Sequence, residues 1–303
     1  MSPGKRKEAL SPKMNEPVIT HVSDTARWIA AYRAIESRRP DALFRDPFAD
    51  RLAGTRGHAI AAKAPLLMAR GGMVIARTKL IDDLVLDCVR GGADLVLNLA
   101  AGLDTRPYRL ALPETLRWVE VDLPGLIAEK ETLLLGERPV CQLTRECADL
   151  TDPNALAVLL DRLGARANRV AVIAEGLLMY LPVAAVEHLT DQMASRPAFR
   201  WWILSLNSSG AVTMLRSGFG RELGGLELPF APRDGVAFFE RRGWRVTEVI
   251  PLVHAARRLR RGTWWLRQLA RLIPKGDPRH PPKRWGAVVR LASERAGPSA
   301  EAM

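Results

Sequence analysis

The stretch best suited to chemistry is a short apolar run that ends in small and acidic residues. Leu95–Leu99 is apolar apart from Asn98 and leads into Ala100-Ala101-Gly102 and then Asp104. This pattern predicts a buried strand that turns sharply towards a helix. In open α/β sheets, ligands bind where such turns leave the carboxyl ends of the strands. We therefore expect a ligand at this turn.

The residues around the turn predict a ligand that has a ribose but no pyrophosphate. Dinucleotide sites use G-x-G-x-x-G, because the glycines let backbone N–H groups close on a pyrophosphate. Here Gly102 stands alone and Asp104 adds a negative charge, while Asp122, twenty residues after Gly102, ends a second apolar run. That spacing is typical of a carboxylate that binds ribose hydroxyls. S-adenosylmethionine fits both observations, although α/β folds without a nucleoside also contain such strand pairs.

Length and composition predict one globular domain. The chain has 303 residues, of which 48% are hydrophobic and 26% charged. Its three cysteines are odd in number and form no C-x-x-C pair, which argues against a disulfide framework or a zinc site and favours a reducing cytoplasm. Met1–Glu8 is charged and lacks the apolar core of a secretory signal. The most apolar window, 170–186, contains Glu175 and Pro182, so no membrane span is predicted.

The net charge of +12 is concentrated in one segment. Residues 251–284 hold ten basic residues and one acidic residue, which leaves +3 for the rest of the chain. Apolar residues between the arginines predict a cationic amphipathic helix over 253–273. Such a helix is suited to an anionic membrane surface and, as a less favoured reading, to nucleic acid. A solvated helix that packs its apolar side on the sheet edge is an equally open interpretation.

Apolar runs and helical periods alternate along the chain. This alternation predicts a doubly wound, mostly parallel sheet. Residues 21–292 would form the domain, with a helical lid at 21–91, a substrate-side insertion at 208–235, and disordered tails at 1–20 and 293–303. The expected strands are 95–99, 118–122, 140–143, 170–174, 201–206, 244–250 and 285–291, and the expected helices are 21–39, 50–53, 71–90, 126–135, 152–163, 182–193 and 236–241.

Several motifs in this order resemble one known family. The resemblance is to the leucine carboxyl methyltransferase family, in its bacterial branch of polyketide-associated O-methyltransferases. It extends from about His21 to Asn207 and implies a class I (Rossmann-like) methyltransferase fold that uses S-adenosyl-L-methionine. The motifs are Asn98–Arg106, Glu120–Pro124, Ala148–Leu150 and Ala174–Leu181, preceded by Thr25–Ser37, Asp46–Ala49 and Arg77–Asp83.

The resemblance also implies a role for individual residues. Glu175 and Tyr180 would be the catalytic pair, with Glu175 beneath the sulfonium. Asp104 either contacts the ligand or caps the next helix, and both roles stay open. Ala100 departs from the family, whose turn usually reads Leu-Gly-x-Gly. The other implied contacts are Arg77 with the cofactor carboxylate, Ala100 to Gly102 with its methionine part, Asp122 with the ribose, and Asp149 and Leu150 with adenine.

The expected chemistry is in-line attack of a substrate oxygen on the sulfonium methyl group. A carboxylate acceptor is already ionised at neutral pH, whereas a hydroxyl acceptor needs a general base. Because no residue stands out as that base, the sequence favours carboxyl methylation of a small molecule without a metal. The alternative is a non-catalytic nucleoside-binding protein that docks on a membrane or RNA through its basic helix.

Overall fold

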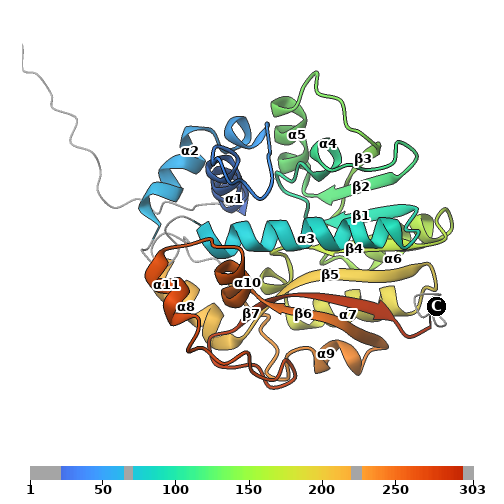
Figure 1. The fold of residues 1–303 in the computed structure, drawn as a ribbon. Helices are drawn as coiled ribbons and strands as arrows, with labels where there is room; N and C mark the ends of the chain where they lie inside the picture. Colours follow the sequence, from blue (N-terminus) through green and yellow to red (C-terminus); the bar gives the residue numbers. More distant parts are fainter. Residues whose placement is uncertain (1–21, 65–70, 220–226, 296–303) are drawn as a thin grey trace, which may run out of the picture.

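A seven-stranded sheet forms the centre of the protein in the computed structural model, which describes residues 22–64, 71–219 and 227–295 (Figure 1). The strand order is β3-β2-β1-β4-β5-β7-β6, and β7 alone runs antiparallel to its neighbours. The predicted doubly wound, mostly parallel sheet is thereby confirmed. The strands are β1 Leu95–Leu99, β2 Arg117–Asp122, β3 Gln142–Cys147, β4 Val170–Ala174, β5 Phe199–Asn207, β6 Trp244–Pro251 and β7 Gly286–Ser293.

Helices cover both faces of the sheet. Successive residues of a strand point to opposite faces, so Val96 packs in the layer that contains α3 while Leu97 packs in the layer that contains α6 and α7. β1 and β4 are buried along their whole length, as expected for central strands of a covered parallel sheet. The helices are α1 Val22–Ser37, α2 Ala49–Lys63, α3 Gly72–Arg90, α4 Arg106–Arg109, α5 Pro124–Leu133, α6 Pro153–Gly164, η2 Leu178–Tyr180, α7 Val183–Ala194, α8 Ser209–Phe219, α9 Ala237–Glu240, α10 Leu252–Arg258 and α11 Trp264–Leu269.

The helices α1 and α2 pack together beside the turn that follows β1. Ala30, Leu52 and Leu103 share one apolar cluster, so this helix pair contacts the turn directly. The prediction of a short helix at 50–53 is wrong, because α2 continues to Lys63 across a kink at Gly54. Gly54 has a φ of 55°, which suits glycine, and the chain resumes the helix beyond it. A lid function for these helices stays a prediction.

One strand prediction and one tail prediction need correction. The strand expected at 140–143 is β3, which begins at Gln142 and ends at Cys147. Its residues are mostly polar and are exposed or only partly buried, because β3 lies at the edge of the sheet, so no apolar run marks it. The tail predicted from residue 293 is wrong at its start, since Ser293 pairs with Trp244 in β7. Residues 1–21 and 296–303, which hold most of the two predicted tails, lie outside the described residues.

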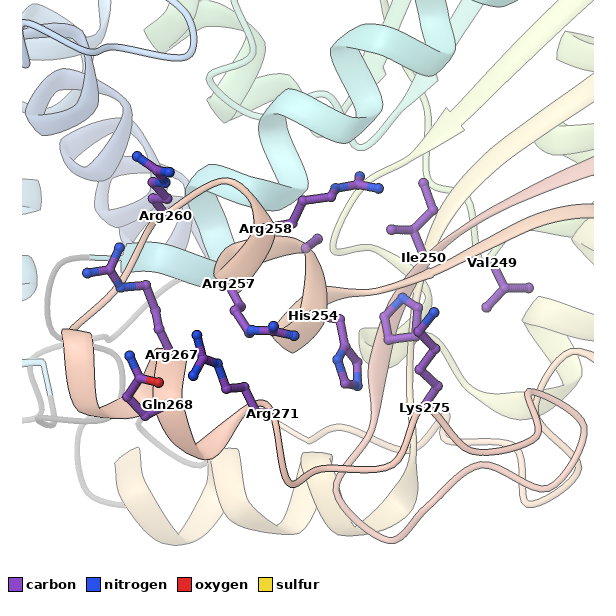
Figure 2. Close-up of a pocket in the computed structure, with 12 residues that line it drawn as sticks. Val249, Ile250, His254, Arg257, Arg258, Arg260, Arg267, Gln268, Arg271 and Lys275 are labelled. Atoms are coloured by element: carbon purple, nitrogen blue, oxygen red, sulfur yellow. The ribbon is translucent and has the colours of Figure 1, made fainter.

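The predicted continuous amphipathic helix over 253–273 is also wrong. The segment forms two short helices, α10 and α11, around a cavity (Figure 2). Between them Arg260 and Gly262 adopt φ values of 56° and 87°, which end the helical path. Arg261 turns inwards at this point and binds Glu36 of α1. The expected insertion at 208–235 contains α8, and its residues 220–226 lie outside the described part.

No helix in the described ranges is both long enough and apolar enough to cross a membrane.

A buried ion pair fixes α5 to β2, the strand that ends at Asp122. Lys130 donates to Glu120 at 2.7 Å, and both side chains are almost completely buried. Lys130→Met would leave the Glu120 carboxylate with Arg145 alone, so we expect the free energy of unfolding to fall by about 3 kcal/mol in urea denaturation.

Arg51→Met is the control, because it breaks the exposed Arg51–Glu137 pair. We expect it to cost less than about 1 kcal/mol. Equal losses in the two variants would contradict a structural role for the buried pair.

Candidate active site

Three carboxylates converge at the carboxyl edge of neighbouring strands. Asp104 follows β1, Asp122 ends β2 and Glu175 follows β4. β1 pairs in parallel with both β2 and β4, so these residues leave the same edge of the sheet. This is the edge at which open α/β sheets bind ligands.

The turn after β1 is held by the carboxylate of Asp122. Its two oxygens accept the backbone N–H groups of Gly102 and Leu123, each at 2.7 Å. Burial raises the pKa of Asp122, and the two N–H donors oppose that rise. Each carboxylate oxygen has a further lone-pair site for a hydroxyl donor. Asp122 therefore joins two strand ends and can still bind a diol.

Ala100 adopts a backbone conformation that normally favours glycine. Its φ is 51°, and Gly102 two residues later has the same value. For a residue with a Cβ, this left-handed region is unfavourable. The glycine that the family usually has at this position thus matches the backbone better than the alanine present here.

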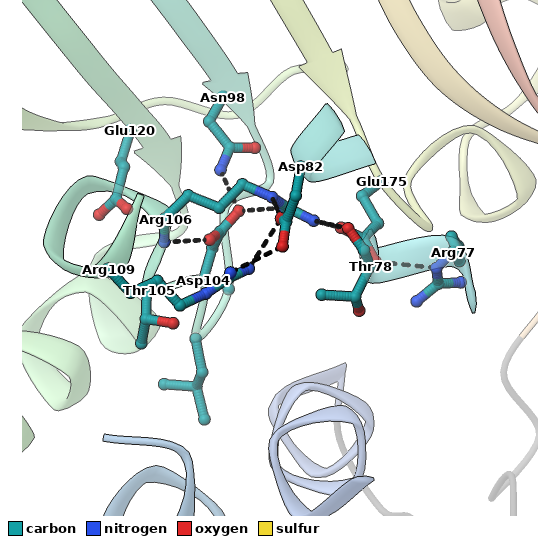
Figure 3. Close-up of polar contacts among 12 residues, drawn as sticks. Arg77, Thr78, Asp82, Asn98, Asp104, Thr105, Arg106, Arg109, Glu120 and Glu175 are labelled. Carbon is teal, nitrogen blue, oxygen red and sulfur yellow. Dashed lines mark hydrogen bonds and ion pairs between the residues drawn. The ribbon is translucent and has the colours of Figure 1, made fainter. Parts of the chain in front are cut away.

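A buried arginine, which the sequence analysis did not identify, connects the site. The guanidinium of Arg106 binds three carboxylates: Nε donates to Asp82 at 2.7 Å, Nη1 to Asp104 at 2.5 Å and Nη2 to Glu175 at 2.9 Å (Figure 3). Its side chain is only 3% exposed. Burial alone disfavours the charge, but the three carboxylates raise the pKa of Arg106 above its ordinary value.

Two further arginines complete a neutral cluster. Arg109 donates to both oxygens of Asp82, at 2.7 and 2.8 Å, and Arg77 donates through Nε to Glu175 at 2.8 Å. Three guanidinium groups thus face three carboxylates, the balance that buried charges require. Within the described residues Arg77 uses only Nε in this way, so both of its terminal nitrogens can donate to a ligand.

The pKa values of the two predicted catalytic residues, Glu175 and Tyr180, are shifted in opposite directions. Burial on its own would raise the pKa of Glu175, but the charges of Arg106 and Arg77 lower that pKa below the usual glutamate range. Burial raises the pKa of Tyr180, which lies on η2 after β4. At neutral pH Glu175 is therefore an anion and Tyr180 a neutral hydrogen-bond donor.

The carboxylate of Asp104 is engaged by the chain itself. It accepts the backbone N–H of Arg106 at 2.7 Å and the Nδ2 group of Asn98 at 2.9 Å. The first of these bonds holds the residue at which α4 begins, but the N-cap of α4 is Thr105, so the expected N-cap role of Asp104 is wrong. A ligand contact by Asp104 stays a prediction.

The two residues predicted to contact adenine, Asp149 and Leu150, follow the end of β3, the strand next to β2. Asp149 is exposed after β3 and accepts the backbone N–H and the Oγ1 hydroxyl of Thr151, at 2.9 and 2.7 Å. These two hydrogen bonds lower the pKa of Asp149. Leu150 beside it is buried. Ala148, the residue before Asp149, donates its N–H to the carbonyl of Asp122. Asp149 and Leu150 therefore come directly after a residue that contacts the predicted ribose site.

Signals for the missed residues existed in the sequence but were ambiguous. Arg106 closes the quoted Asn98–Arg106 motif, and Thr78 and Asp82 lie one turn apart on the buried face of α3. A polar residue at such a position needs a partner, but the sequence does not say which one. Within the described ranges, no group of three or more His, Cys, Asp or Glu residues could hold a metal ion.

Comparison with known proteins places these features in a family. The sequence profile of leucine carboxyl methyltransferases matches residues 26–194. A presumed S-adenosyl-L-methionine-dependent methyltransferase of Streptomyces coelicolor is 34% identical over 239 residues, which cover 74% of this chain and 83% of the relative.

Solved structures agree on the fold. A DUF574 family protein from Streptomyces avermitilis superposes with a TM-score of 0.56 at 16% identity, over 91% of this chain and 98% of the other. A presumed methyltransferase from Thermobifida fusca gives a TM-score of 0.54 at 18% identity, over 94% and 100% of the two chains.

The strained turn gives a direct test of the site's backbone. Ala100→Gly removes a left-handed alanine that costs about 1–2 kcal/mol and adds the unfolded-state entropy of glycine, about 0.4–1 kcal/mol. We therefore expect the free energy of unfolding to rise by about 0.5 kcal/mol in urea denaturation.

Ala101→Gly is the matched control, because Ala101 has no positive φ. Ala101→Gly adds the entropic cost of glycine and also removes a buried methyl group, so the free energy of unfolding should fall by about 1–2 kcal/mol. If both variants lost stability alike, Ala100 would not be strained.

Proposed function

The chain belongs to the leucine carboxyl methyltransferase family and is an S-adenosyl-L-methionine-dependent methyltransferase, and we propose that it methylates a carboxylate oxygen of a small-molecule acceptor. The observation that carries this proposal is the state of Glu175. Two arginines stabilise its charge and lower its pKa, so it is a weak base. A hydroxyl acceptor would need a base with a pKa near neutrality.

The described residues fit the cofactor. Asp122 has acceptor sites for two ribose hydroxyls beside its backbone bonds, and Arg77 has a free pair of terminal nitrogens, which suits a carboxylate. Ala100 and Gly102 would lie against the methionine part, with Asp149 and Leu150 at the adenine. The alternative of a non-catalytic nucleoside-binding protein gains no support from the similar proteins.

The cofactor supplies a methyl group on a positively charged sulfur. The chain would bind both ends of it, through Asp122 and Arg77, so that the methyl group has one fixed direction. An acceptor carboxylate is ionised at neutral pH and loses no proton on attack. Tyr180 stays protonated and can donate a hydrogen bond to the second oxygen of the acceptor. Alignment then accounts for most of the acceleration.

A cytoplasmic location belongs to the same proposal. Cys88, Cys141 and Cys147 are all free thiols. Free cysteines are the rule in reducing compartments.

The ribose contact predicts a binding defect. Asp122→Asn removes a charge-assisted acceptor, so we expect binding of S-adenosylhomocysteine to weaken by about 1.5–3 kcal/mol in isothermal titration calorimetry. Asp161→Asn makes the same charge change at an exposed pair on α6 and should leave the affinity unchanged. Unchanged affinity in Asp122→Asn would place the ribose elsewhere.

Pairs of substrates test the acceptor class. Each pair consists of a carboxylic acid and the alcohol that corresponds to it. We expect turnover of acids only, with kcat/KM constant from about pH 6 to 8 because the acceptor is already ionised. The product should be an ester that mild base cleaves. Turnover of the alcohols with a rate that rises over this range would contradict carboxyl methylation and leave methyl transfer itself intact.

A further inference from the structure

A basic cavity lies apart from the residues assigned to methyl transfer. It has a volume of about 680 Å³ and is bounded by the end of β6, by α10, and by α11 and the chain after it. Figure 2 shows the side chains of His254, Arg257, Arg267 and Arg271 around it. Among the described residues that line it, none is acidic. A concave surface with one sign of charge concentrates counter-ions.

Within the described residues, no ion pair compensates the charges of Arg257 and Arg271 in this cavity. The carboxylate of Glu36, on the neighbouring helix α1, already binds Arg261, and that of Asp41 binds Arg39. Across residues 22–64, 71–219 and 227–295, no ion pair reaches Arg257 or Arg271.

Two nitrogens of the cavity lining also lack a partner. In the described part of the chain, Nε2 of His254 and Nε of Arg267 are buried without a hydrogen-bond partner. Buried polar atoms are normally satisfied. Because these two nitrogens are buried, they do not face the cavity, and the direct contacts to an anion fall to the other charged groups that line it.

Large apolar side chains are exposed beside the cavity. Trp264 is 68% exposed and Leu272 is 82% exposed, and Leu269 and Ile273 between and after them are exposed as well. Such a patch next to unpaired cations is typical of a surface that inserts into the interface of an anionic membrane. An RNA site would need the cations but not this apolar patch.

We propose that residues 252–275 form a membrane-docking surface, in which the basic cavity binds the phosphate of an acidic phospholipid headgroup and Trp264, Leu269, Leu272 and Ile273 enter the interface. β6 runs parallel to β1 and β4, so α10 leaves the same edge of the sheet as the turn after β1. Docking therefore brings the active-site edge towards the membrane.

Cosedimentation with vesicles tests the docking surface. We expect the full chain to bind phosphatidylglycerol–phosphatidylcholine vesicles and not pure phosphatidylcholine. Arg257→Ala with Arg271→Ala should lower the partition coefficient about thirtyfold at low salt. Trp264→Ser with Leu272→Ser should lower it about tenfold, and this loss should persist at high salt.

Matched controls change the same charge and apolarity elsewhere. Arg138→Ala with Arg166→Ala removes two exposed arginines, and Leu135→Ser with Val158→Ser removes two exposed apolar side chains. Both pairs should bind vesicles like the unmodified chain, and circular dichroism checks that all variants are folded.

Three results would overturn the proposal. The first is that the full chain does not bind vesicles, even if it binds inorganic pyrophosphate saturably. The second is an equal loss of binding in the control variants, which would indicate net charge alone. The third is binding of an RNA duplex that depends on Arg257 and Arg271 while vesicles do not bind.

Discussion

The buried guanidinium of Arg106 is the interaction on which the site depends. A charge that is 3% exposed is tolerable only with close counter-charges. These come from three separate places: Asp82 on α3, Asp104 after β1 and Glu175 after β4. One side chain therefore fixes the distance between a covering helix and two strand ends, and any shift of these elements would leave a buried charge unpaired.

The same ion pairs also limit the acid–base chemistry that Glu175 can perform. Because Arg106 and Arg77 stabilise the anion of Glu175, this carboxylate does not take a proton near neutral pH. The site is suited to placing groups and charges rather than to removing protons. Asp122 stands apart from the cluster and binds the turn through backbone N–H groups, so it can meet a ribose without disturbing the ion pairs.

Much of the fold was predictable, because it depends on local patterns. β4 follows directly from an uninterrupted apolar run, β1 from a run broken only by Asn98, and α3 from its helical period up to Gly91. β3 was misplaced because an edge strand needs no apolar run. The sequence predicted which types of residue lie at the turn and at the strand ends. The roles of these residues came from the resemblance to the family, and those roles remain proposals.

The ion pairs were not predictable, because sequence distance hides them. Arg77 and Glu175 are 98 positions apart, and Arg261 and Glu36 are 225 apart. For the same reason the basic segment was expected as one amphipathic helix. Its periodicity favours a helix throughout, but the burial of Arg261 against α1 requires the chain to turn.

The charge state of Glu175 tests the account most directly. A ¹³C NMR titration of the glutamate side-chain carboxyl groups, with Glu175→Gln to assign the signal, measures its pKa in the folded protein. We expect the Glu175 carboxylate to titrate below the ordinary glutamate range, because Arg106 and Arg77 stabilise its charge. Titration of Glu175 between about pH 6 and 8 would show a working general base and would contradict it.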